Sequence, residues 1–213
     1  MVNKIYRKEG TKMKVLFATT NPAKVKKYKE ELEKNGIELL TIKDINLDVH
    51  VDETGKNCLE NAYIKASAYC RETGMTTIGM DNSLFIEELP EEKQQGTHVR
   101  RVNGKELTDD EMIEYYQGLV EEYGGKLTAK WVYGMVICRG DDKEEFSWSK
   151  DEFYFVNKVS EKRNPGYPLD SMSIDKKTNK YFVDLTKEDR DLIDKEKAKS
   201  DKDVIDFLIK NLK

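Results

Sequence analysis

The sequence lacks a long apolar segment, since none of its uninterrupted hydrophobic runs approaches the roughly 20 residues that a membrane span requires. It also lacks a signal-peptide pattern at its start, where residues 1–12 are polar and charged without clear periodicity and predict a tail. With 213 residues, the chain is long enough for one sizeable domain, or two lobes that share a core, over residues 13–213. We therefore expect a cytoplasmic protein without a membrane partner.

Cysteine and histidine are scarce as well. The three cysteines, Cys58, Cys70 and Cys138, are odd in number and lack metal-ligand spacing, which predicts buried free thiols in a reducing compartment. The two histidines, His50 and His98, cannot by themselves build a multi-histidine metal site. Any metal would therefore be bound by carboxylates, and this favours magnesium over zinc.

Charge is abundant, but neither sign is in large excess. Asp, Glu, Lys and Arg make up 37% of the residues, and 41 acidic against 37 basic side chains give a net charge of −4. Because no long basic run accompanies this balance, we expect no extended nucleic-acid surface. The sequence also contains no internal repeat and no GxxxxGK[ST] segment, which excludes a standard P-loop nucleotide site.

Residues 13–34 combine a short apolar run with a helical pattern. The run at residues 15–18 predicts a buried strand, after which Asn21 is a suitable N-cap and Pro22 suits the first helical position. Such a junction gathers free backbone N–H groups and the positive end of the helix dipole, and Lys24 adds a full charge. The arrangement suits an anion, although an ordinary strand–helix unit with solvated lysines has the same local pattern.

A second helix is predicted over residues 57–71. Asn57, with Glu60 three residues later, resembles a capping box. Asn57, Asn61 and Lys65 recur every four residues and share one polar face, which either follows a polyphosphate or is simply solvated. The predicted buried stripe consists of Leu59, Ala62, Tyr63, Ala66, Tyr69 and Cys70.

An acidic residue follows the next predicted strand, residues 76–80. Asp81 begins an Asp-Asn-Ser sequence that predicts a tight bend, and residues 84–86 form a separate apolar run. Functional side chains often lie at strand ends in α/β sheets. Asp-Asn pairs also form turns without any further role, so both interpretations of Asp81 stay open.

The remaining elements up to residue 123 alternate between regular and irregular patterns. We predict a strand at residues 37–42 and a loop or irregular strand at 44–51. Residues 90–104 are polar and irregular and predict a mobile flap, from which Arg101 would either reach phosphate or be solvated. An amphipathic helix is predicted over residues 108–123.

The C-terminal part predicts a hairpin and two helices. Residues 126–139 and 144–159 form two long β segments around a turn, and their aromatic residues favour a core sheet over a base-stacking platform. Residues 164–170 predict a rigid, proline-marked loop. A charged helix is predicted over residues 187–199, and Ser200 would cap a final helix that docks on the core.

Three motifs in register resemble the inosine triphosphate pyrophosphatase family. Residues 19–24 (TTNPAK) match its T-x-N-x-x-K segment, residues 53–55 (ETG) its acidic loop, and residues 61–66 (NAYIKA) its N-A-x-x-K-A helix. The similarity covers nearly the whole chain from Met13 onward. It implies an α/β fold with a long mixed β-sheet flanked by helices, two lobes with a central cleft, and commonly a homodimer.

The resemblance also implies an activity, namely hydrolysis of a nucleoside triphosphate to the monophosphate and pyrophosphate with Mg²⁺. A triphosphate carries about four negative charges, so attack at phosphorus needs neutralisation by metal and lysine. By resemblance, Glu53 would coordinate Mg²⁺, Asp81 would bind metal or activate the attacking water, and Lys24 would assist catalysis. The implied substrate contacts are Thr19, Asn21, Lys24, Asn61, Lys65, Tyr167 and Lys195.

Three departures from the family pattern concern the acids and the base. The family's D-D-S-G reads MDNS at residues 80–83, and its F-G-[YW]-D loop reads PGYP at 165–168, where Tyr167 remains available to stack and Asp170 is displaced by two positions. Its S-H-R reads DKE at residues 194–196. We therefore expect turnover with a base preference altered from inosine and xanthosine. A nucleotide-binding protein without turnover and a structural domain with solvated motifs are the alternatives.

Overall fold

The computed structural model describes residues 12–47 and 49–213, apart from the side chains of Ala23 and of residues 194–200. The strands are β1 (Met13–Phe17), β2 (Ile37–Thr41), β3 (Thr77–Ile86), β4 (Arg101–Val102), β5 (Lys105–Glu106), β6 (Lys126–Arg139), β7 (Asp142–Ser149), β8 (Phe153–Val156) and β9 (Ser173–Asp175). The helices are α1 (Pro22–Lys34), α2 (Ile42–Ile45), α3 (Cys58–Thr73), α4 (Asp109–Glu122) and α5 (Lys187–Leu212), with short 3-10 turns η1 (Glu91–Lys93), η2 (Pro168–Ser171) and η3 (Phe182–Asp184).

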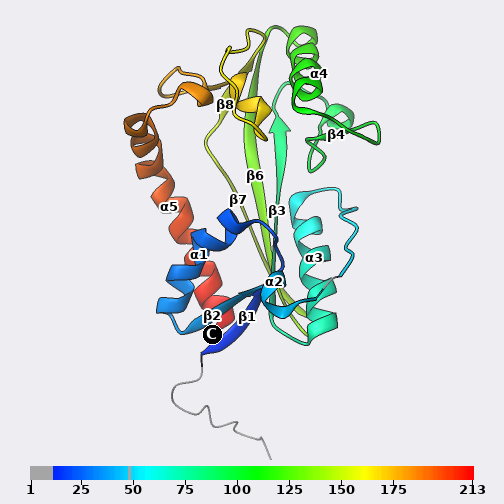
Figure 1. Ribbon diagram of the computed structural model, residues 1–213, viewed down its shortest axis with the longest axis vertical. Coiled ribbons are helices and arrows are strands. Elements are labelled where there is room, and N and C mark those ends of the chain that lie inside the picture. The colour runs from blue at the N-terminus through cyan, green and yellow to red at the C-terminus, as the bar shows by residue number, and fades with distance from the viewer. Residues whose placement is uncertain (1–11, 48) are drawn as a thin grey trace, which may run out of the picture.

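A mixed seven-stranded sheet confirms the expected α/β fold class. Its order is β2-β1-β3-β6-β8-β9, with β7 also paired to β6. Strand β1 is parallel to β2 and β3, whereas β3, β7 and β8 are all antiparallel to β6. Helix α3 covers one side of β3 and β6, and α1 and α5 lie on the other side (Figure 1).

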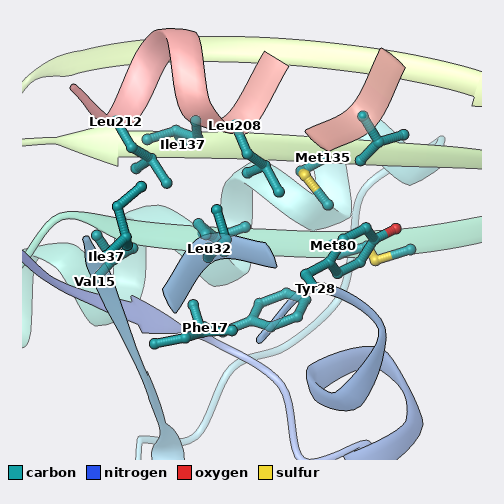
Figure 2. Packing of buried hydrophobic residues seen from close by; sticks show 13 residues of the cluster. Val15, Phe17, Tyr28, Leu32, Ile37, Met80, Met135, Ile137, Leu208 and Leu212 are labelled. Atoms are coloured by element: carbon teal, nitrogen blue, oxygen red, sulfur yellow. The ribbon is translucent and has the colours of Figure 1, made fainter. Parts of the chain in front are cut away.

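The main apolar cluster lies between the sheet and helices α1 and α5. Figure 2 shows Tyr28 and Leu32 of α1 packed against the strands beneath the last turns of α5. The predicted docking of the C-terminal residues is confirmed, since Leu208 and Leu212 are fully buried. The predicted break at Ser200 is wrong, because a single helix runs through it. The sequence of α5 contains no glycine or proline that would end the helix earlier.

Strand β3 corrects the predicted bend at Asp81. The strand continues through the Asp-Asn-Ser sequence, and Asp81 pairs with Gly134 in the middle of the ladder. The long partner strand β6 pairs with every residue of β3. This pairing overrides the turn preference of Asp and Asn, which is weak compared with an uninterrupted ladder. Asp81 is therefore an acid within a central strand.

The second arm of the predicted hairpin is interrupted. Ser149 pairs with Val132, and Phe153 pairs with Ala129, so three residues of the arm (150–152) oppose two residues of β6 (130–131). This is a β-bulge, which separates β7 from β8 while both follow the same edge of β6. The first arm, by contrast, has the predicted bounds of 126–139.

Two segments predicted as irregular contain regular structure. Residues 42–45 form the short helix α2, because Thr41 and Asp44 make a capping box at its start. Within the predicted flap, the Gln94 side chain accepts from the backbone N–H of Ile86 and donates to its carbonyl, and the flap ends in the β4–β5 hairpin. These contacts tie the segment to β3, and its mobility stays a prediction.

The remaining predictions on burial are mostly confirmed. All three cysteines are buried and free. Tyr63 was expected in the buried stripe of α3 but is 41% exposed, since it lies at the edge of that face. None of the helices that the structure describes has the length and the apolar character needed to cross a membrane.

Candidate functional site

A group of charged side chains converges on Asp81. Lys65 Nζ lies 3.1 Å from Asp81 Oδ1 and 2.9 Å from Glu53 Oε2, and the Asn61 amide donates to Asp81 Oδ2 at 3.1 Å. Asp81 is only 9% exposed. The structure thus brings together the acidic loop, the α3 motif and strand β3, which are separated in sequence. We call Lys24, Glu53, Lys65 and Asp81 the charged cluster.

Two glycines place α3 close enough to the sheet for these contacts. A Cβ atom on Gly79 would lie 2.0 Å from the carbonyl oxygen of Ala62, and one on Gly134 would lie 2.7 Å from backbone atoms of α3. Side chains alternate between the faces of a strand, so Asp81 shares the α3 side of β3 with Gly79. The glycines therefore allow the helix backbone to lie on the strands beside the carboxylate.

Asn61 is a buried connector rather than part of a solvated face. It is 1% exposed, accepts from the backbone N–H of Gly55 at 2.7 Å, and donates to Asp81. A Cβ atom on Gly55 would lie 2.6 Å from Asn61 Oδ1, so the acidic loop closes tightly over this amide. The polar face, for which the sequence left a solvated role open, is thus partly buried, and Asn61 holds the loop of Glu53 against β3. A direct contact between Asn61 and substrate stays a prediction.

The cap of α3 is simpler than the predicted capping box. The Asn57 side chain accepts from the Glu60 backbone N–H at 3.0 Å. The Glu60 carboxylate accepts from the N–H of Lys56 and from the Asn57 side-chain amide, so the reciprocal bond to the N-cap backbone is replaced. Asn57 therefore has a structural role at the start of α3.

Lys24 reaches the cluster from α1, which lies on the opposite side of the sheet from α3. The Asn21 side chain accepts from the Lys24 backbone N–H at 3.4 Å, and Thr19 Oγ1 accepts from the N–H of Asn21 at 3.2 Å. The Lys24 ammonium donates to the carbonyl of Met80 at 3.4 Å. Burial, followed by the nearby ammonium of Lys65, lowers the pKa of Lys24. The positively charged N-terminus of α1 and both lysines thus lie near one point.

The donor set of the cluster fits Mg²⁺. One ammonium lies within hydrogen-bond distance of both carboxylates, so their oxygens converge on a single cation position. Carboxylate oxygens are the ligands that Mg²⁺ prefers, and the ion usually retains several waters. The described residues contain no group of three or more His, Cys, Asp or Glu side chains that could hold a metal. Glu53 and Asp81 would therefore supply two ligands, with water or substrate completing the shell.

A cavity of about 410 Å³, separate from the charged cluster, is lined by Asn82 and by residues of α5. We call it the aromatic cavity, because Trp131, Tyr133 and Tyr167 are among its lining residues. Tyr167 is 64% exposed. The side chain of Lys195, the other predicted contact on the base side, lies outside the described residues. The sequence favoured a core role for Trp131 and Tyr133, and their exposure to a cavity depends on tertiary packing that no local pattern encodes.

The aromatic cavity also holds charged groups. The Asp170 carboxylate accepts from the Asn164 amide at 2.8 Å, and burial raises its pKa, partly offset by this hydrogen bond and then by the charge of Arg190. Arg190 lines the cavity and donates to the carbonyl of Phe182. No motif pointed to Arg190, because it lies outside the segments matched to the family.

Two further hollows help to place the other predicted residues. One of about 380 Å³ is lined by Glu53 and Asn61 on one side and by His98 and Arg101 on the other, so the predicted flap faces the charged cluster. A groove of about 520 Å³ along α1 includes Thr19 but none of the charged cluster. The larger groove therefore shares Thr19 with the predicted site but contains none of the four cluster residues.

Comparison with known proteins confirms the family resemblance. Residues 15–199 match the model of the Ham1 family. The chain is 26% identical over 182 residues to the dITP/XTP pyrophosphatase of Bacillus subtilis (strain 168), covering 84% of this chain and 88% of that protein. It is 30% identical over 128 residues to the dITP/XTP pyrophosphatase of Bacillus licheniformis, where the match spans 58% of this chain and 63% of that relative's length.

Solved structures of similar fold include two Ham1 proteins. The HAM1 protein from Coxiella burnetii has a TM-score of 0.70 at 20% identity, covering 85% of this chain and 91% of that one. The Staphylococcus aureus Ham1 protein has a TM-score of 0.68 at 21% identity, covering 83% and 88%. At this level of identity, the likeness supports the fold alone.

Proposed function

Since this chain belongs to the Ham1 family, we propose that it hydrolyses a nucleoside triphosphate to the monophosphate and pyrophosphate, as an enzyme that cleans the nucleotide pool. The observation that carries the proposal is the charged cluster, in which Lys65 contacts both Glu53 and Asp81. An acid at 9% exposure beside two lysines is an arrangement that is typical of functional sites. The names of the relatives, dITP/XTP pyrophosphatases, support the same reaction class.

In this proposal the lysines bind phosphate. Lys24, at the N-terminus of α1, and Lys65, on α3, offset the negative charge of the triphosphate and orient it over β3. A bound Mg²⁺ would polarise phosphate oxygens and ease deprotonation of water. Asp81 is held in place by Asn61, so that its carboxylate can accept a proton from the water that attacks phosphorus. The anhydride bond then breaks, and pyrophosphate leaves with its electron pair.

We further propose that the base preference differs from inosine and xanthosine. Residues 194–196 read DKE where the family has S-H-R, and an acid at this position would repel the anionic form of xanthine. The aromatic cavity offers Tyr167 for stacking, and Asp170 and Arg190 for polar contacts with a base edge. A clear preference for inosine triphosphate in a side-by-side kinetic comparison would contradict this part of the proposal.

Pyrophosphate release from a panel of canonical and modified triphosphates with Mg²⁺ tests the activity. Asp81→Asn and Glu53→Gln should each abolish release, whereas Asp141→Asn, an exposed acid in the β6–β7 turn, is the matched control and should retain it. Loss of release on chelation of the metal would support the role of Mg²⁺. Unchanged release from both site variants would contradict the assignment of the cluster.

A nucleotide-binding protein without turnover is the second candidate. Met80 stands where the family has the first acid, and its side chain is 4% exposed in the apolar cluster with Tyr28 (Figure 2). Nucleotide binding without pyrophosphate release, indifferent to Asp81→Asn, would favour this candidate.

We also propose a cytoplasmic homodimer, as the family resemblance implies, and light scattering of the purified chain would test the dimer.

A further inference from the structure

Lys65 contacts acids rather than open solvent. Its side chain is 13% exposed, and its ammonium lies 2.9 Å from Glu53 and 3.1 Å from Asp81. The two carboxylates belong to different elements, since Glu53 lies in the loop before α3 and Asp81 in the middle of β3. The ammonium therefore bridges the loop and the sheet at the position where their oxygens converge.

Lys24 differs from Lys65 although both belong to the charged cluster. Its ammonium donates to the carbonyl of Met80 at 3.4 Å. In the part of the chain that the structure describes, no carboxylate lies within 4.0 Å of it. Lys65 thus occupies the space between the two acids, whereas Lys24 does not. Substitutions of the two lysines can therefore be compared within one protein.

We propose that Lys65 is a placeholder for the metal ion, whose ammonium holds the cation position between Glu53 and Asp81 until nucleotide arrives. Two carboxylates that both contact one ammonium lie close enough to repel each other when no cation lies between them. A lysine has a flexible four-carbon stem and a compact charge, so its ammonium can exchange carboxylate oxygens for phosphate oxygens without displacement of α3. The inference rests on the proposed function, because it assigns phosphate as the second partner of Lys65.

The placeholder has a measurable consequence for metal binding. In the free protein a divalent cation must displace the ammonium, so the free protein should bind metal weakly. A nucleotide offers the ammonium a new partner and should thereby raise metal affinity, and by reciprocity the metal should raise nucleotide affinity by the same factor. Lys65 would in this way make metal and nucleotide bind together.

Titration of the nucleotide-free protein with Mn²⁺, followed by electron paramagnetic resonance, tests the inference. Lys65→Met should bind Mn²⁺ about tenfold or more tightly than the wild type, because the competing charge is gone. Lys24→Met removes the same charge nearby and is the matched control, with an expected change below about threefold. A non-hydrolysable triphosphate should then raise Mn²⁺ affinity less in Lys65→Met than in the wild type.

Equal or weaker Mn²⁺ binding by Lys65→Met would overturn the inference, as would an equal gain in Lys24→Met. The double variant Lys65→Met/Asp81→Asn should lose the gain, which locates the ion, and retention of the gain would also overturn the inference. Lys65→Gln serves the same purpose if the methionine variant does not fold. A gain in Mn²⁺ affinity in Lys65→Met together with absent hydrolysis by the wild type would remove the proposed function but support the placeholder. Hydrolysis by the wild type without that gain in the variant would remove the placeholder alone.

Discussion

The charged cluster and the aromatic cavity are built in different ways. In the cluster, Asp81 and Glu53 are joined by Lys65 through direct bonds, and Gly79 lets the supporting helix approach the sheet. In the aromatic cavity, five of the fourteen lining residues are aromatic, and Asp170 is bonded to Asn164 rather than to another cavity charge. The cluster is therefore preorganised for one kind of chemistry, and the cavity offers shape. Changes in the first should affect every substrate, and changes in the second should alter the choice among substrates.

The largest expected effect comes from the approach of α3 to the sheet. Gly79→Ala places a methyl group 2.0 Å from a backbone carbonyl, which no side-chain movement can relieve. We expect a loss of more than about 3 kcal/mol in the free energy of unfolding, measured by urea denaturation. Gly118→Ala in α4 meets no atom within 4 Å and is the control, with an expected gain of about 0.5–1 kcal/mol. A small loss in Gly79→Ala would mean that the helix can shift, and the cluster with it.

The next effect separates the phosphate side from the base side. Lys24→Met should lower kcat/KM by about 10²-fold for every triphosphate that is cleaved, since the variant loses a charge that we propose binds phosphate. Lys26→Met, an exposed lysine on the same helix, should change kcat/KM little. Steady-state kinetics on several substrates would measure both. A loss confined to one base would contradict the division between the two regions.

A smaller effect is expected in the aromatic cavity. Tyr167→Ala should raise KM by about tenfold for nucleotides, because base stacking on an aromatic ring contributes about 1–3 kcal/mol. Inhibition by tripolyphosphate, which has no base, should stay unchanged. Tyr63→Ala is the control, since Tyr63 is also partly exposed but lies on α3 away from this cavity. Equal effects of the two tyrosine variants would show that Tyr167 does not contact the base.

The smallest effect concerns Asp170 and pH. Burial raises the pKa of this carboxyl above its ordinary value of 3.8. Between pH 3.8 and the raised pKa of the folded protein, the native state therefore binds more protons than the unfolded state. Stability contributed by Asp170 therefore falls as pH rises through this window. Asp170→Asn should unfold like the wild type below pH 3.8 and gain less than about 1 kcal/mol at neutral pH. Urea unfolding at both pH values would measure this, and a loss at neutral pH would show that the charge is stabilising.

The contrast between the two regions also explains what the sequence could predict. Caps and helical spacing predict Lys24 in the first turn of α1 and Lys65 on the face of α3 that carries Asn61, whereas only the family resemblance assigned the two lysines to one site. The position of Asp81 within a strand could not be predicted, because its neighbours prefer turns and only the pairing with β6 overrides this preference. The burial of Asn61 likewise depends on Gly55 closing over it, a contact between loop and helix. Arg190 joins the aromatic cavity only through the packing of α5.

The bulge at residues 150–152 sets the register of the strand that follows it. Trp148 and Phe153 face the same side of the sheet only because one extra residue lies between their strands, opposite residues 130–131. Regular pairing of the same residues without the bulge would place Glu152 and Tyr154 opposite Ala129 and Leu127, and would present them to the core in place of Phe153 and Phe155. Deletion of one of residues 150–152 should therefore remove the bulge and leave Phe153 opposite Ala129. The extra residue thus keeps the apolar side chains of β7 and β8 on one face of the sheet.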